Sequence, residues 1–387
     1  MTGLGAIIRA ANARRNAIRE VASSAIGANL ACALRARWLP LPPPMPSSRD
    51  IAVAIDGTGH SVGLSTGAHL IVALAIALGP EPIGRIDRAD VEALPARFDD
   101  ASAASARDLI MRALETETAL EALRRVMASN SGSRSTIWVD GSLFADLAHM
   151  AGGPTVVRWG GGAERAGALL RATRDLHVEA ERAGAYLIGL AKTQRASLLA
   201  PVLGANQPEY GAPPVAVTLT DPSDIAEHRA RDGEILAAMP EGWSWPLLLD
   251  ARQFPAIEAE AATILNDCPA IITTYIRPHA ADLPLRLDVP ASALHLPHRV
   301  GVRSPHAQPD PATWLPEPNA MAPFVAEVMA RYGGVLAHNG PLHAVDRVVR
   351  MSRPDLELVV VPTIARAVGV HPSALGVDRG RRRFLLD

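Results

Sequence analysis

The sequence predicts one mixed α/β domain, and three observations support this class. Short apolar runs that suit strands alternate with longer segments whose apolar residues recur at helical intervals. The 387 residues show no repeat with a period of about 20 to 50 residues, which excludes a repeat array. A hydrophobic content of 48% and a charged content of 20% are typical of a globular protein with a sizeable core.

The first 46 residues are predicted to form a helical arm ahead of a single domain that spans 47–387. Apolar residues of the arm fall at helical intervals, as at Ile7, Ile8 and Ile18, so we expect amphipathic helices there. The proline-rich run 39–46 suits neither a helix nor a central strand, and it separates the arm from the domain.

Within the domain, strands and helices are expected to alternate. Strands are expected at 51–55, 66–79, 136–139, 185–191, 215–220, 245–250, 270–277, 284–289 and 356–361. Helices are expected at 101–128, 162–183, 255–266, 320–332 and 341–351, with one short helix completing the chain. The proline- and histidine-rich segment 290–318 is expected to form a long surface loop.

Charge and cysteine content narrow the possible functions. A net charge of −2 gives no overall basic field for nucleic acid, although a local basic groove remains compatible with it. The two cysteines, Cys32 and Cys268, match neither a disulfide framework nor a zinc spacing, so we expect reduced thiols in a cytoplasmic protein. The longest apolar stretch, 70–78, is shorter than the roughly 20 residues of a membrane helix, so we expect no membrane association.

Two predicted strands end in the same way, with an aspartate followed by glycine and a hydroxyl residue. These aspartates are Asp56 and Asp140. One such residue commonly serves only as a turn former, but two on adjacent strands would present paired carboxylates at one edge of the sheet. Such oxygen ligands suit Mg²⁺ and Mn²⁺, and a pair of these metals can support in-line displacement at phosphorus.

A third carboxylate is expected from the helix at 101–128. With residues placed about 100° apart, Glu117 lies at the edge of the apolar stripe, whereas Glu115 faces away and Glu121 is intermediate. An acid on an apolar face costs stability unless it is paired or bound to metal. Glu117 is therefore the predicted ligand, a plain salt bridge is its competing explanation, and Glu115 and Glu121 remain open.

Lys192 is the single lysine among 38 basic residues. A compact ammonium differs from a guanidinium mainly where a site is tight or close to a metal or phosphate. Lys192 directly follows the apolar strand at 185–191, so it is either a functional residue at the end of that strand or a chance survivor.

Two more segments carry candidate residues. Tyr275 and Arg277 share one strand, although a half-buried position in the sheet is the common place of a strand tyrosine. His343 and Asp346 lie three positions apart on the helix at 341–351 and so share a face. An acid or imidazole from this helix would complete a metal site with the two aspartates, and a solvated helix face is the alternative.

Taken in order, these segments resemble the NurA nuclease family, which has an RNase H-like core. The closest match is 137–143, which reads apolar–Asp-Gly-Ser-Leu, and 188–193 follows with apolar–Gly-x-x-Lys-Thr. Further matches are 275–277, 286–290 and the helix that begins with Gly340-Pro341. The resemblance covers about 50–350, but the last helix lacks the family's Ala-His pair in a fixed register. Segment 290–318 matches no part of the family pattern.

The resemblance implies an RNase H-like mixed sheet flanked by helices and a metal-dependent deoxyribonuclease that processes DNA ends. It implies a homodimer that works with a HerA-type hexameric ATPase in DNA repair or phage defence. Lys192 would neutralise phosphate oxygens, and Tyr275 would position the water or a phosphate. The ligands of two Mn²⁺ or Mg²⁺ ions would be Asp56, Glu117, Asp140 and Asp346.

Two other functions are compatible with parts of the pattern. Actin-like and sugar-kinase-like ATPases open with Asp-x-Gly-Thr on a first strand, but 56–59 reads Asp-Gly-Thr-Gly and no second glycine-rich hairpin is evident. A DNA clamp or motor adaptor with a decayed site is the non-enzymatic alternative. Retention of Asp56, Asp140 and Lys192 argues against such decay.

Overall fold

The computed structural model describes residues 4–16, 28–45, 51–81, 83–129, 135–143, 162–192, 196–204, 230–250, 259–300, 312–371 and 375–376. The strand expected at 215–220 lies outside this part of the chain, as do Thr193 and the middle of the 290–318 segment. The helices within these ranges include none long and apolar enough to cross a membrane.

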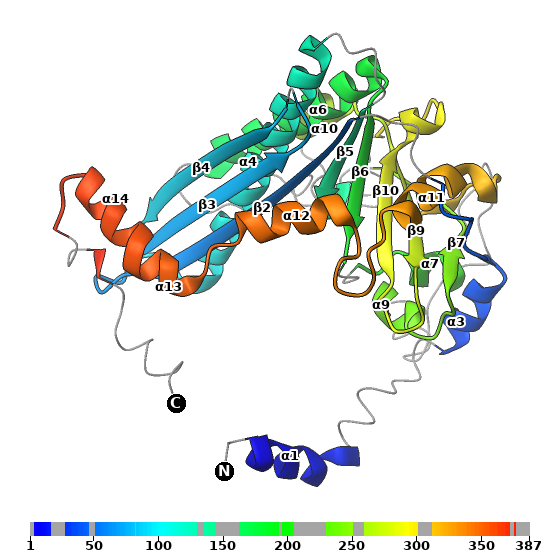
Figure 1. The fold of residues 1–387 in the computed structure, drawn as a ribbon, viewed down its shortest axis with the longest axis horizontal. Coiled ribbons are helices and arrows are strands. Elements are labelled where there is room, and N and C mark those ends of the chain that lie inside the picture. Colours follow the sequence, from blue (N-terminus) through cyan, green and yellow to red (C-terminus); the bar gives the residue numbers. More distant parts are fainter. Residues whose placement is uncertain are drawn as a thin grey trace.

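Among the described residues, a mixed β-sheet of 11 strands forms the centre of the fold, which confirms the predicted α/β class (Figure 1). The order along the sheet is β1-β7-β9-β10-β6-β5-β2-β3-β4, with β8 pairing to β9 and β11. Strand β5 runs parallel to both β2 and β6, whereas the other pairs are antiparallel. The strands are β1 (Trp38–Leu39), β2 (Ile51–Gly63), β3 (His69–Leu78), β4 (Arg85–Leu94), β5 (Ser135–Asp140), β6 (Tyr186–Ala191), β7 (Gly242–Ser244), β8 (Leu247–Leu249), β9 (Ile271–Arg277), β10 (Leu285–Pro290) and β11 (Thr313–Trp314).

Helices cover both faces of this sheet, with α4 and α6 on one face and α11 and α12 on the other (Figure 1). The α-helices are α1 (Leu4–Ala13), α3 (Ala28–Arg35), α4 (Asp100–Ala128), α6 (Gly162–Ala183), α7 (Leu199–Gly204), α9 (Asp232–Leu236), α10 (Ala259–Leu265), α11 (Ala322–Ala330), α12 (Gly340–Val349), α13 (Arg353–Asp355) and α14 (Val361–Ala367). Short helical segments of other types are η4 (Ala291–Leu294), η5 (Pro318–Met321) and η6 (Leu356–Val360).

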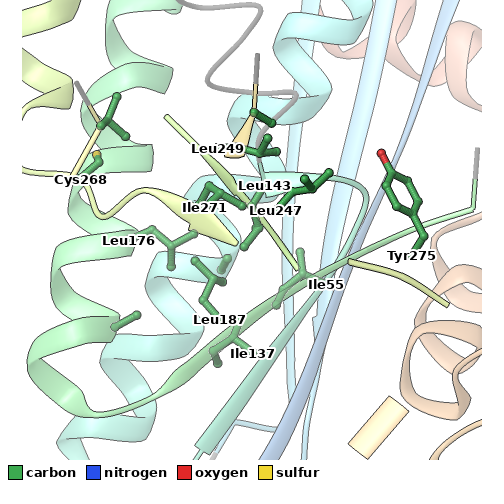
Figure 2. Packing of buried hydrophobic residues seen from close by; sticks show 14 of the residues in the cluster. Ile55, Ile137, Leu143, Leu176, Leu187, Leu247, Leu249, Cys268, Ile271 and Tyr275 are labelled. Atoms are coloured by element: carbon green, nitrogen blue, oxygen red, sulfur yellow. The ribbon is translucent and has the colours of Figure 1, made fainter. Parts of the chain in front are cut away.

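Alternating side chains of β2 enter two different hydrophobic cores. Val53 and Ile55 belong to the core under α4 and α6, where Figure 2 shows Ile55 near residues of neighbouring strands such as Ile137. Ala54 belongs to the second core, which Leu342 and other α12 residues help to form. Because successive strand residues point to opposite faces, Asp56 is directed toward the α12 face and Gly57 toward α4.

The segment that follows the arm's first helix is part of the body of the protein. Helix α3 packs against α7 and α9, and Leu34 is fully buried in the core under α4 and α6. Strand β1 joins the sheet, where Trp38 pairs with Ser244 of β7.

Three of the differences from the expected elements have a clear physical reason. Strand β2 continues to Gly63 beside β3, so the Asp56-Gly-Thr segment lies inside a strand and forms no turn. Strand β4 was not expected, because its alternating charged residues hide the apolar pattern. The strand expected at 356–361 is wrong: Ser352 caps a helical segment there by accepting a hydrogen bond from the Asp355 N–H at 3.1 Å.

Candidate functional site

Asp56 and Asp140 lie side by side on neighbouring parallel strands. Ile55 pairs with Val139 in register, so the residues that follow them are also neighbours. Strand β5 ends at Asp140 while β2 continues to Gly63. The two carboxylates therefore lie at the carboxyl end of β5, where β2 loses this neighbour. The Gly57 N–H donates to Oδ1 of Asp56 at 2.8 Å and holds that side chain, which is only 8% exposed.

Lys192 joins this pair from the next strand. In β6, Leu190 pairs with Asp140, and Lys192 follows directly after the end of the strand. Its Nζ lies 2.7 Å from Oδ2 of Asp140, and 39% of the lysine side chain is exposed. The single lysine of the chain is therefore held by a strand aspartate and is reachable from solvent.

Glu115 approaches Gly57, the neighbour of Asp56, from helix α4 on the other face of the sheet, and the absent side chain of Gly57 provides the space for it. A Cβ atom at Gly57 would lie 2.8 Å from Cγ of Glu115, so any other residue at this position would force the Glu115 side chain to shift. Glu115 is 9% exposed. The glycine after Asp56 thus permits a close approach of α4 to β2, and it does not form a turn.

The charges at this site are poorly compensated. Burial, with a second contribution from the negative charge of Asp140, raises the pKa of Asp56 to about 7, against smaller opposing effects of the Gly57 N–H and Lys192. Burial also raises the pKa of Glu115 to about 8, with a second contribution from Asp56. Buried acids that repel one another in this way favour a bound proton or cation.

Helix α12 brings further polar residues to the opposite side of the strands. The charge of Asp346 contributes to the raised pKa of Asp56, so the two carboxylates interact across the α12 face. Asp346 also forms an ion pair with Arg350, with Nη2 2.7 Å from Oδ2. His343 lies on the same helix and is half-buried.

His338 is a neighbour of the site that the sequence analysis missed. Burial lowers its pKa, the positive charge of Lys192 lowers it further, and the charge of Asp140 raises it. Its Nε2 atom is buried without a hydrogen-bond partner among the described residues. The available signal was its place just before Asn339, which caps α12 by accepting a hydrogen bond from the Leu342 N–H.

Glu117 and Glu121 do not reach the strand aspartates. Both bind Arg88 of β4, with distances of 3.2 Å from Nη1 to Glu117 and 2.7 Å from Nη2 to Glu121. The expectation that Glu115 faces away from the buried side is wrong. Helix α4 packs against both the sheet and α6, so its buried surface is wider than the single stripe inferred from the sequence.

Tyr275 is also placed away from the site. It is fully buried, and its hydroxyl donates a hydrogen bond to Asp232. Oδ1 of Asp232 accepts hydrogen bonds from the Leu198 and Leu199 N–H groups, each at 2.8 Å. Tyr275 therefore anchors the chain that leads into α7, while Arg277 donates to the Met239 carbonyl at 2.6 Å.

The donor chemistry of the site fits a hard divalent cation. Asp56, Glu115, Asp140 and Asp346 offer carboxylate oxygens, the ligands that Mg²⁺ and Mn²⁺ prefer. Within the part of the chain that the structure describes, no three His, Cys, Asp or Glu side chains are already grouped as a metal-binding cluster. Binding would therefore require side-chain rotation, while Asp140 can keep Lys192 on Oδ2 and offer Oδ1.

Comparison with solved structures shows a NurA-like fold. The NurA nuclease from Sulfolobus solfataricus aligns with a TM-score of 0.54 over 92% of this chain and 95% of that chain, at 14% identity. A second NurA structure gives 0.52 over 92% and 99%, at 11% identity, and NurA with manganese gives 0.48 over 92% and 97%, at 14% identity. No family model matches the sequence, and neither does any curated protein.

Proposed function

We propose that this chain is a divalent-metal-dependent deoxyribonuclease that hydrolyses phosphodiester bonds. The observation that carries the proposal is the grouping of acidic residues around the carboxyl end of β5 in a NurA-like sheet. Asp56 and Asp140 lie on neighbouring strands, Lys192 contacts Asp140, and Glu115 approaches from α4. Carboxylates with raised pKa values next to a lone ammonium group suit a site that handles a cation and a phosphate together.

Asp56, Glu115, Asp140 and Asp346 are the residues that would hold Mn²⁺ or Mg²⁺. Two such ions, when bound, supply hydroxide at neutral pH and offset charge on the leaving oxygen. Glu115 takes the place that the sequence analysis gave to Glu117, because it is the α4 acid that adjoins Asp56. Asp56 and Glu115 would release protons as the cation binds, since both have raised pKa values.

Lys192 would contact the substrate phosphate. Its ammonium group offers three donors, of which one is directed to Asp140 in this structure. The remaining donors can bind a non-bridging phosphate oxygen and offset the negative charge that grows on it in the transition state. Asp140 thus has two roles, since it orients the lysine and offers an oxygen ligand.

We extend the proposal to a cytoplasmic homodimer that works with a HerA-type hexameric ATPase in DNA repair or phage defence. The net charge of −2 is compatible with an enzyme to which a motor delivers the DNA, because such an enzyme does not need a positive electrostatic field to attract it. Co-expression with an adjacent hexameric ATPase, followed by size-exclusion chromatography, would test this part separately.

The kinase-like alternative finds no support in the surroundings of the Asp-Gly-Thr-Gly segment. Gly57 lies against Glu115, and a Cβ atom at Gly59 would lie 2.9 Å from Cγ of Arg107. Both glycines serve the close packing of α4 on a continuous strand, so they do not form a phosphate-binding hairpin.

The Asp140→Asn variant tests the proposal most directly. Purified wild type should degrade end-labelled linear DNA with Mn²⁺ but not with EDTA, and the variant should lose more than about 100-fold in rate, because even the outer partners of metal ligands are worth about 10- to 100-fold. Asp87→Asn, which removes an exposed ion pair with Arg85, is the matched control and should retain activity. Full activity of Asp140→Asn would refute the site, and DNA binding without cleavage in any divalent metal would favour the adaptor.

A further inference from the structure

A buried ion pair lies on β10, the strand that pairs with β6, and β6 leads directly to Lys192. Nε of Arg286 lies 2.8 Å from Oδ1 of Asp288, and their side chains are 5% and 0% exposed. The Thr273 hydroxyl also donates to Oδ1 of Asp288. Because removing two charges from water costs about as much as their attraction returns, a buried pair of this kind is weak evidence for a stabilising role.

The second oxygen of Asp288 binds the turn that follows Asp140. The Ser142 hydroxyl donates to Oδ2 of Asp288 at 2.5 Å, across a sequence separation of 146 residues. The turn is also attached to β6, where the Gly141 N–H donates to the Leu190 carbonyl at 3.1 Å. Strands β6 and β10 thus both hold the backbone next to Asp140.

Gly189 of β6 allows this turn to cross above the sheet. A Cβ atom at Gly189 would lie 2.8 Å from the Gly141 carbonyl oxygen and 3.0 Å from the Leu143 nitrogen. Gly141 itself has a φ of +134°, which disfavours any other residue. Gly189, the glycine of the apolar–Gly-x-x-Lys motif, is therefore required at this position because it lets Ser142 reach β10.

The same network lies beside the end of β6, on the neighbouring strand. Asp288 pairs in register with Gly189, and Arg286 pairs with Ala191, the residue before Lys192. One buried ion pair consequently adjoins both the turn that carries Asp140 and the strand end that carries Lys192.

We propose that Ser142 and Asp288 are positioning residues that set the place of the Asp140 carboxylate relative to Lys192. Asp288 acts from within the core through the Ser142 hydroxyl, and Arg286 and Thr273 keep Asp288 in one orientation. The proposed consequence for catalysis rests on the nuclease function above, whereas the geometric claim about Asp140 and Lys192 does not.

Ser142→Ala tests the proposal, because it removes the hydroxyl while Asp288 keeps its bonds to Arg286 and Thr273. We expect kcat for Mn²⁺-dependent DNA cleavage to fall roughly 10- to 100-fold with little change in KM, as for a displaced catalytic group. Ser142→Thr retains a hydroxyl and should restore most of the rate. Ser129→Ala, which removes a hydroxyl that donates to the Val126 carbonyl at 2.7 Å, is the control and should leave kcat unchanged.

A second readout needs no activity. Reductive methylation with ¹³C-formaldehyde labels the single lysine, so Lys192 gives one side-chain NMR signal besides that of the α-amino group. Asp140→Asn defines the signal position without the ion pair, and Ser142→Ala should move the signal toward it, whereas Ser129→Ala should not. An unmoved Lys192 signal in Ser142→Ala, or an undiminished kcat, would overturn the positioning role. An inactive wild type with a moved signal would instead refute only the nuclease function.

Discussion

Helix α4 carries acidic residues in two very different surroundings. On the side toward β4, Glu117 and Glu121 share one arginine, Arg88, and remain partly exposed, with 41% and 30% of their side chains accessible. On the side toward β2, two residues before Glu117, Glu115 is buried over Gly57 and close to Asp56. The first region resembles an ordinary surface ion-pair network, whereas the second concentrates negative charge in a place shielded from water.

The difference indicates which acid is suited to a cation. A carboxylate that already has a guanidinium partner gains little from a metal, and exposed pairs of this kind contribute only about 0 to 1 kcal/mol to stability. A buried carboxylate that adjoins another carboxylate is destabilising unless it is protonated or bound to a cation. Burial beside a second acid therefore distinguishes Glu115 from Glu117 more clearly than position on the helix does.

Exchange of the two glutamates for glutamine should give the largest contrast. Glu115→Gln should lower the rate of Mn²⁺-dependent DNA cleavage by more than about 100-fold, because it removes a proposed metal ligand. Glu117→Gln should stay within about twofold of wild type, because it removes only one partner of Arg88. Initial rates on end-labelled linear DNA measure both. Equal losses in the two variants would remove the distinction between the two regions.

Alanine at the two strand glycines should give an intermediate effect. In Gly57→Ala the new methyl group would displace Glu115, and we expect roughly a 10-fold loss of rate and a lower Tm. In Gly59→Ala the methyl group would meet Cγ of Arg107, which is not a proposed metal ligand, so the rate should change little. Cleavage assays and thermal unfolding compare the two. A greater loss of rate in Gly59→Ala would contradict the close approach of Glu115.

The smallest expected effect is a pH-dependent change in stability without metal. The pKa of folded Glu115 is raised to about 8 from an ordinary value of 4.5, so its contribution to stability is present at low pH and is lost as pH rises toward 8. In EDTA at pH 8, Glu115→Gln should therefore unfold about 2 to 5 °C above wild type, with a smaller difference at pH 5. Differential scanning calorimetry measures this.

Glu117→Gln is the control for this experiment. This substitution removes no buried carboxylate, so its Tm relative to wild type should not increase between pH 5 and pH 8. If Glu115→Gln raised Tm over wild type by the same amount at pH 5 and pH 8, the charge of the Glu115 carboxylate would not be the cause of that increase.

Much of the fold could be predicted from local patterns. Apolar runs located most strands, and the long apolar periodicity of 101–128 located α4. Strand β4 was missed because it is an edge strand with alternating charged residues. The strand prediction for 356–361 was wrong because a serine cap and helix packing outweigh the β propensity of Leu and Val there.

The candidate site could be predicted only in part. The repeated motif of an apolar run followed by Asp-Gly pointed to Asp56 and Asp140, and the single lysine pointed to Lys192, because these features are visible in the sequence itself. Helical periodicity could not identify Glu115, since that method assumes one buried face and α4 has two packed sides. Tyr275 matched a motif but is buried against Asp232, a contact between segments 43 residues apart.

The sequence by itself determined which residue types were available and that they follow apolar runs: two aspartates, each with a glycine after it, and one lysine. Only the tertiary structure decided which of three glutamates enters the site, that Ser142 reaches Asp288, and that Tyr275 stays in the core. Local periodicity depends on neighbours within a few residues. Burial and charge at this site depend on elements that lie 50 to 150 residues apart and meet only when the sheet assembles.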